Sequence, residues 1–121
     1  MPAGTIIIAD DHGPTRRVLV ELLTSDGWTV LEARDGEELL HLASMNRLDA
    51  VVTDLSMPRM DGLRAARALR SSEDTAEVPI VAITAQALTP TQRQELGLLF
   101  DRVISKPVRP AELREGLRRA G

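Results

Sequence analysis

The chain has 121 residues and a net charge of −3, and it contains no cysteine. This length fits one domain, and the absence of cysteine excludes disulfide scaffolds, zinc–thiolate sites and thiol chemistry. The short apolar runs exclude a transmembrane helix, and we expect no signal peptide because the first residues lack a basic and an apolar region. The weak negative charge argues against a dedicated nucleic-acid binder. Fourteen arginines accompany a single lysine, Lys106.

Short apolar runs rich in β-branched residues alternate with longer amphipathic stretches. The runs are too short for helices. Most of them are continuous rather than alternating, as in strands that are buried on both faces of a parallel sheet. In chain order they cover residues 6–9, 28–31, 50–52, 80–83 and 103–104.

The stretches between these runs carry signals for the start of a helix. The signals are Pro14, the capping-box pairs Asp35/Glu38 and Thr89/Gln92, Asp61-Gly62, and Pro110. Gly27 is predicted to end the first helix. A strand followed by a helix therefore repeats five times, which predicts an α/β fold with a doubly wound parallel sheet and right-handed crossovers.

Polar side chains stand at the ends of four predicted strands: Asp10 and Asp11, Asp54, Thr84 and Lys106. In open α/β sheets, ligands bind at the carboxyl ends of the strands. Three converging carboxylates repel one another, so protonation, Lys106 or a divalent cation must neutralise them. An all-oxygen cluster favours Mg²⁺. With a cation in place, phosphate is the obvious missing ligand, because a hydroxyl, an ammonium and backbone amides could cradle its oxygens.

Each of these residues alone has an ordinary structural interpretation. An Asp-Asp pair commonly forms a turn after a strand, and single Asp, Thr or Lys-Pro residues are common strand ends. The conjunction of five such residues on four strand ends of one sheet is what favours a site.

The sequence resembles the receiver domain of two-component response regulators (CheY-like) over essentially its whole length, as a single domain of residues 1–121. The resemblance is carried by Asp10-Asp11, the segment D-L-S-M-P-R-M-D-G at 54–62, Ile83-Thr84-Ala85 and Lys106-Pro107. It implies a flavodoxin-like (βα)5 fold with strand order 2-1-3-4-5.

The resemblance also implies a chemistry for the acidic residues. Asp54 is expected to accept a phosphoryl group from a partner's phosphohistidine, forming an aspartyl phosphate. Asp11, Asp54 and the backbone carbonyl of Ser56 are expected to bind Mg²⁺ directly, and Asp10 mainly through water.

Further roles follow from the same resemblance. Lys106 is expected to pair with Asp54 before transfer and with the phosphoryl group afterwards. Thr84 and the backbone of Ala85 are expected to contact other phosphoryl oxygens. Ser56 and Gln86 stand where the family tunes the phosphoryl lifetime; each could equally be a plain surface residue. The Lys106–Pro107 bond is expected to be cis.

One position departs from the family pattern. Val103 stands three residues before the lysine, where the family usually carries Tyr or another aromatic residue. The chain has two aromatic residues, Trp28 and Phe100, and both are expected to be packing residues. The aromatic switch that accompanies movement of Thr84 is therefore in doubt, and backbone movement of the loops after the third and fourth strands is the alternative.

The main hypothesis is a cytoplasmic phosphoacceptor switch that promotes only its own phosphorylation and dephosphorylation. Its expected partners are a histidine kinase or phosphotransfer protein and an unknown downstream protein. We expect no direct contact with nucleic acid or membrane, and a phosphorylation-dependent dimer is a further possibility. The alternative is a degenerate receiver that acts as a phosphate-independent interaction module. A Mg²⁺-dependent phosphohydrolase would need a second aspartate where Ser56 stands, and a flavodoxin would need a Ser/Thr-rich loop where Asp10 and Asp11 stand.

Overall fold

The computed structural model describes residues 3–118; residues 1–2 and 119–121, which the predicted domain also includes, lie outside the described residues. Strands and helices alternate along the chain as predicted. They are β1 (Gly4–Ala9), α1 (Gly13–Ser25), β2 (Trp28–Ala33), α2 (Gly36–Met45), β3 (Ala50–Asp54), α3 (Gly62–Ser71), β4 (Ile80–Thr84), α4 (Pro90–Leu96), β5 (Arg102–Ser105) and α5 (Pro110–Gly116). All strand pairs are parallel, and the order β2-β1-β3-β4-β5 confirms the predicted topology.

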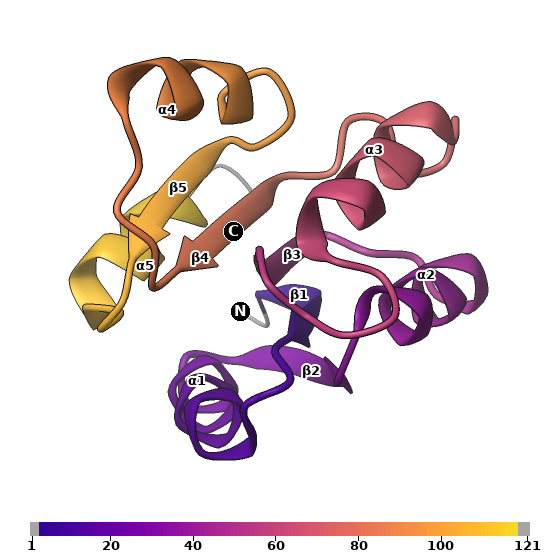
Figure 1. Ribbon diagram of the computed structural model, residues 1–121. Coiled ribbons are helices and arrows are strands. Elements are labelled where there is room, and N and C mark those ends of the chain that lie inside the picture. The colour runs from indigo at the N-terminus through magenta and orange to yellow at the C-terminus, as the bar shows by residue number, and fades with distance from the viewer. Residues whose placement is uncertain (1–2, 119–121) are drawn as a thin grey trace.

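The helices cover both faces of the sheet (Figure 1). On one face α1, α5 and the residue that follows α5 pack against Ile6, Ile8, Val52 and Ile83, through the side chains of Leu19, Leu23, Leu113 and Leu117. On the other face α2 and α3 pack through Leu39, Ala65, Ala66 and Leu69 against Ile7, Val51, Ile80 and Ala82. Every residue of β3 and β4 is buried, which accounts for their continuous apolar runs.

Of the two predicted capping boxes, the one at α4 is confirmed, and the one at α2 forms only in part. At α4 both bonds of the capping box between Thr89 and Gln92 are present. At α2 the Asp35 carboxylate accepts from the Glu38 amide at 2.8 Å. The Glu38 carboxylate, however, accepts from the amide of Arg34 at 2.7 Å instead of from that of Asp35.

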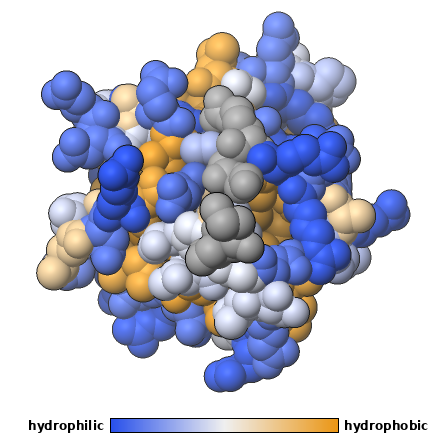
Figure 2. Space-filling model, turned by 180° about the vertical axis from the view of Figure 1, so that it is seen from behind, coloured by the Kyte–Doolittle hydropathy of each residue, from blue (hydrophilic) through white to orange (hydrophobic). Residues whose placement is uncertain are grey.

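The aromatic side chains are packing residues, as expected. Phe100 is buried in the loop before β5 and belongs to the core on the α2–α3 face. Trp28 is buried at the start of the edge strand β2, in the core on the α1–α5 face. Figure 2 shows one face of the molecule, on which hydrophobic patches lie among hydrophilic residues. No helix in residues 3–118 is long and apolar enough to cross a membrane.

Candidate functional site

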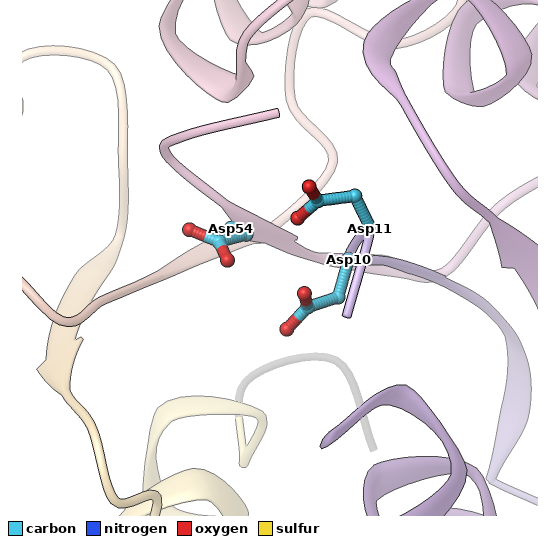
Figure 3. Close-up of side chains that lie close together, drawn as sticks. All are labelled: Asp10, Asp11 and Asp54. Carbon is cyan, nitrogen blue, oxygen red and sulfur yellow. The ribbon is translucent and has the colours of Figure 1, made fainter. Parts of the chain in front are cut away.

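The ends of β1 and β3 bring three carboxylates together (Figure 3). Asp10 and Asp11 follow β1, and Asp54 is the last residue of β3, which pairs with β1. One carboxylate oxygen from each residue lies within 4.8 Å of the others. Asp10 and Asp54 are buried and Asp11 is exposed, so the cluster is open to solvent on one side.

The two oxygens of Asp54 are held by different groups. Oδ1 accepts from the backbone amide of Ser56 at 3.0 Å. Oδ2 accepts from Nζ of Lys106 at 2.7 Å. Burial by itself would lower the pKa of Lys106, but the hydrogen bond to Asp54 and the charge of Asp10 bring that pKa above its ordinary value. Lys106 is therefore a cation at neutral pH, and it forms ion pairs with Asp54 and Asp10.

Asp10 is the least satisfied member of the cluster. Its Oδ1 accepts from the amide of His12 at 2.9 Å. Its Oδ2 is the one buried side-chain nitrogen or oxygen among residues 3–118 without a hydrogen bond, although Nζ of Lys106 lies 3.3 Å away. Burial, and then the charge of Asp54, raise the pKa of Asp10 above its ordinary value.

This arrangement fits a hard cation. Lys106 forms ion pairs with two of the three carboxylates, and Oδ2 of Asp10 has no hydrogen bond. The cluster supplies oxygen atoms alone, which suits Mg²⁺ better than softer metals. Mg²⁺ commonly binds through one or two carboxylates and keeps several waters. The exposed Asp11 leaves room for those waters.

The end of β4 supplies hydroxyl and amide groups beside the cluster. Thr84 is buried and is the register partner of Ser105 on β5. Its hydroxyl oxygen accepts from the Gln86 amide at 3.0 Å, which leaves the hydroxyl hydrogen free to be donated elsewhere. Its carbonyl accepts from the Lys106 amide at 2.8 Å. Ala85 and Gln86 are exposed, and the Lys106–Pro107 bond is cis, as the resemblance implied.

The loop between β3 and α3 lies tightly against the end of β3. The amide of Gly62 donates to the carbonyl of Leu55 at 3.1 Å. A Cβ at Gly62 would collide with the carbonyl oxygen of Asp54. Glycine is therefore required here by the close approach of α3 to the strand that carries Asp54.

Val103 is half-buried and packs against the core on the α2–α3 face. With Arg93, Ser105 and Lys106 it lines a surface pocket of about 600 Å³ between α4 and α5. The guanidinium of Arg93 donates to the Ser105 hydroxyl oxygen at 3.2 Å. A polar contact thus joins α4 to β5 next to Val103, the position that departs from the family pattern.

Sequence reasoning missed several contributors to the site. The His12 amide holds Asp10, and Nη1 of Arg16 donates to the Asp10 carbonyl at 2.7 Å. The ion pair between Arg59 and Asp35 fastens the β3–α3 loop. These are backbone donors or contacts between separate turns, which no local pattern encodes.

Known proteins are similar to this chain in sequence and in fold. The model of the response regulator receiver domain matches residues 6–118. The sensor histidine kinase RcsC of Salmonella typhi is 37% identical over 112 residues, which are 93% of this chain and 12% of that protein. The response regulator MprA of Mycobacterium sp. (strain KMS) is 39% identical over 108 residues, which are 89% of this chain and 46% of that protein. The chain thus spans only part of these relatives.

Solved structures agree on the fold. The receiver domain of the sensor histidine kinase PA1611 of Pseudomonas aeruginosa, described with a magnesium ion coordinated in its active-site cleft, superposes with a TM-score of 0.85 at 32% identity, covering 95% of this chain and 94% of that one. The chemotaxis response regulator CheY4 of Vibrio cholerae gives 0.87 at 28% identity, with 98% of each chain covered. The chain belongs to the response regulator receiver domain family.

Proposed function

We propose that this chain is a phosphoacceptor switch in a two-component phosphorelay, in which Asp54 accepts a phosphoryl group from a partner's phosphohistidine. The observation that carries the proposal is the placement of the Asp54 carboxylate between the Ser56 amide and the Lys106 ammonium, beside two further carboxylates. The donor would be a histidine kinase or a phosphotransfer protein, and the output would pass through a downstream protein. We place the chain in the cytoplasm with this role.

The transfer would be a single displacement. A carboxylate oxygen of Asp54 attacks phosphorus, the P–N bond breaks, and its electron pair stays on the imidazole nitrogen of the donor. Lys106 would leave its contact with Asp54 for an oxygen of the arriving phosphoryl group. Thr84 would donate its hydroxyl hydrogen to a second oxygen, and the backbone of Ala85 would donate to a third.

Asp10, Asp11, Asp54 and the backbone carbonyl of Ser56 would hold Mg²⁺, with Asp10 acting mainly through water. The ion would neutralise charge on the transferring group and keep donor and acceptor in line. Ser56 and Gln86 are both exposed and line the same surface pocket. We propose that their side chains limit the approach of water to the phosphoryl group and thereby set its lifetime.

The test is incubation with a small-molecule phosphodonor and Mg²⁺, followed by intact-mass measurement. We expect one phosphoryl adduct in the wild type and none in Asp54→Asn. Asp26→Asn is the matched control, because Asp26 lies at the far end of α1 in an ion pair with Arg114, and it should still form the adduct. A wild type that binds Mg²⁺ without forming an adduct would contradict the proposal.

Val103 is the observation that favours a second candidate, a degenerate receiver acting as a phosphate-independent interaction module. In that case a partner would bind equally well before and after treatment with the phosphodonor. Partner binding measured in both states separates the two candidates, because the switch requires a difference in affinity.

A further inference from the structure

The middle of the β3–α3 loop is fastened to the start of α2 by two contacts. The guanidinium of Arg59 donates through both Nε, at 2.9 Å, and Nη2 to Oδ2 of Asp35. The amide of Gly36 donates to the carbonyl of Met60 at 2.8 Å. We call these four residues the α2 clasp.

The conformations of three clasp residues are suited to these contacts. The Asp35 side chain is only 4% exposed and also accepts from the Glu38 amide at the start of α2. Arg59 has a φ of +63°, a left-handed conformation that costs a residue other than glycine roughly 1 kcal/mol or more. A Cβ at Gly36 would collide with the carbonyl oxygen of Met60. The backbone conformations of these residues therefore allow the β3–α3 loop to lie close to the start of α2.

The clasp acts on a loop that begins at the acidic cluster. Residues 55–61 follow Asp54 directly, and the amide of Ser56 holds Oδ1 of Asp54. At the other end, the Gly62 amide donates to the Leu55 carbonyl. A displacement of Arg59 and Met60 therefore changes the path of a short loop whose first residues face the carboxylates.

We propose that Arg59 and Asp35 are positioning residues for the acidic site. Their ion pair sets the path of the β3–α3 loop, keeps the Ser56 backbone beside Asp54, and thereby strengthens the binding of Mg²⁺. The inference rests on one part of the proposed function, the binding of Mg²⁺ by the acidic cluster. It does not require phosphoryl transfer.

The experiment is calorimetric titration of Mg²⁺ into the wild type and Arg59→Ala. Outer-shell partners of metal ligands are typically worth 10–100-fold in affinity, and we expect a loss of roughly tenfold, near the lower end. Arg114→Ala is the matched control, because Arg114 also donates through Nε and Nη2 to an aspartate, Asp26, at 2.7 and 3.1 Å. Asp26 lies at the opposite end of α1 from the cluster, so this variant should bind Mg²⁺ as the wild type does.

Two more variants separate positioning from general stability. Arg59→Asn keeps a residue that tolerates the left-handed conformation and should still lose affinity, because the ion pair is gone. Asp35→Asn keeps an N-cap but removes the charge. Combined with Arg59→Ala, it should lower the affinity no further than Arg59→Ala alone, since both remove the same contact.

Hydrogen exchange of backbone amides, measured without Mg²⁺, tests independently whether the clasp contacts are present. The Gly36 amide should exchange faster in Arg59→Ala and at the wild-type rate in Arg114→Ala. The inference is overturned if Arg59→Ala changes Mg²⁺ affinity no more than Arg114→Ala does, if the effects of Asp35→Asn and Arg59→Ala are additive, or if the wild type binds no Mg²⁺. If the wild type binds Mg²⁺ but forms no phosphoryl adduct, the proposed function is contradicted. The comparison of Mg²⁺ affinity between Arg59→Ala and Arg114→Ala still tests the role of the clasp.

Discussion

The ammonium of Lys106 and the carboxylate of Asp54 meet at 2.7 Å, although they come from strands that are not neighbours. β4 lies between β3 and β5 and ends at Thr84. Strands two positions apart in a sheet are separated by about 10 Å, so a long, slender side chain is needed to span this distance. The side chain of Lys106, the single lysine of the chain, spans this distance.

Lys106→Arg should keep the positive charge and still impair phosphorylation. The planar guanidinium is wider than an ammonium and cannot make the same point contacts with Asp54 and Asp10. Loss of one preorganised donor commonly costs a hundredfold or more in rate, so a decrease of about tenfold or more is expected for this partial replacement. The measurement is the rate of adduct formation with a small phosphodonor, and Arg109→Lys, at an exposed position, is the control. Equal rates for wild type and Lys106→Arg would refute this role.

Asp10→Asn should raise the melting temperature in the absence of Mg²⁺. Burial and the charge of Asp54 disfavour the ionised form of Asp10, as its raised pKa shows. A neutral amide of similar shape removes that repulsion. Thermal unfolding in a chelator should show a gain of a few degrees, and added Mg²⁺ should stabilise the variant less than the wild type. A variant that melts below the wild type in the chelator would contradict the prediction.

Gly62→Ala should destabilise the fold by about 1–3 kcal/mol, the usual cost of overpacking. The added Cβ would collide with the Asp54 carbonyl oxygen, which is backbone of a buried strand and cannot give way easily. Gly13→Ala is the control, because a Cβ there has no neighbour within 4 Å and alanine favours the helix. Urea unfolding measures both variants, and equal midpoints would show that the collision is relieved without cost.

Acid should weaken the fold partly through Asp35. The hydrogen bond from the Glu38 amide, and then Arg59, hold the pKa of Asp35 below its ordinary value of 3.8. The ionised carboxylate therefore stabilises the folded state above about pH 4, and this contribution is lost as the pH falls through the lowered pKa. Urea unfolding of Asp35→Asn should show a lower free energy of unfolding at pH 7 and a shallower decline below pH 4. A decline parallel to that of the wild type would count against this role.

Arg93→Ala should loosen α4 without abolishing phosphorylation. None of the residues of α4 is fully buried. Besides the partly buried Leu96, which packs against the core, the contact from Arg93 to Ser105 joins this helix to β5. A hydrogen bond contributes about 1 kcal/mol, which corresponds to exchange roughly fivefold faster in the amides of residues 90–96. Gln94→Ala, at an exposed position on the same helix, should leave the exchange unchanged. If both variants exchange alike, the contact does not anchor the helix.

The sequence was sufficient to predict the fold and the edge of the sheet where polar groups gather. The order of strands and helices depends on periodicity and on turn residues, which are local signals. The convergence of Asp10, Asp11 and Asp54 then follows from strand order, because β1 and β3 are neighbours. Once these strands are adjacent, residues at their ends must lie close together.

The contacts that the sequence did not predict depend on tertiary geometry. The pairing of Arg59 with Asp35 requires a left-handed arginine and the packing of two separate turns, and neither has a periodic signature. The same holds for the Glu38 carboxylate, which bonds to Arg34 one residue away from the position that a capping box predicts. Val103 was recognised as a departure, but the proximity of Arg93 was visible only in the folded chain.

The contrast between a fully buried β3 and an α4 with no buried residue divides the molecule by local stability. We expect β3, which carries Asp54, to open only with global unfolding, and α4 to open at a lower free energy. A phosphoryl group on Asp54 would change the charge in a rigid setting, and the softest neighbouring segment would respond first. This difference in burial implies that substitutions in α4 can change the local stability of that helix while the surroundings of Asp54 stay as they are.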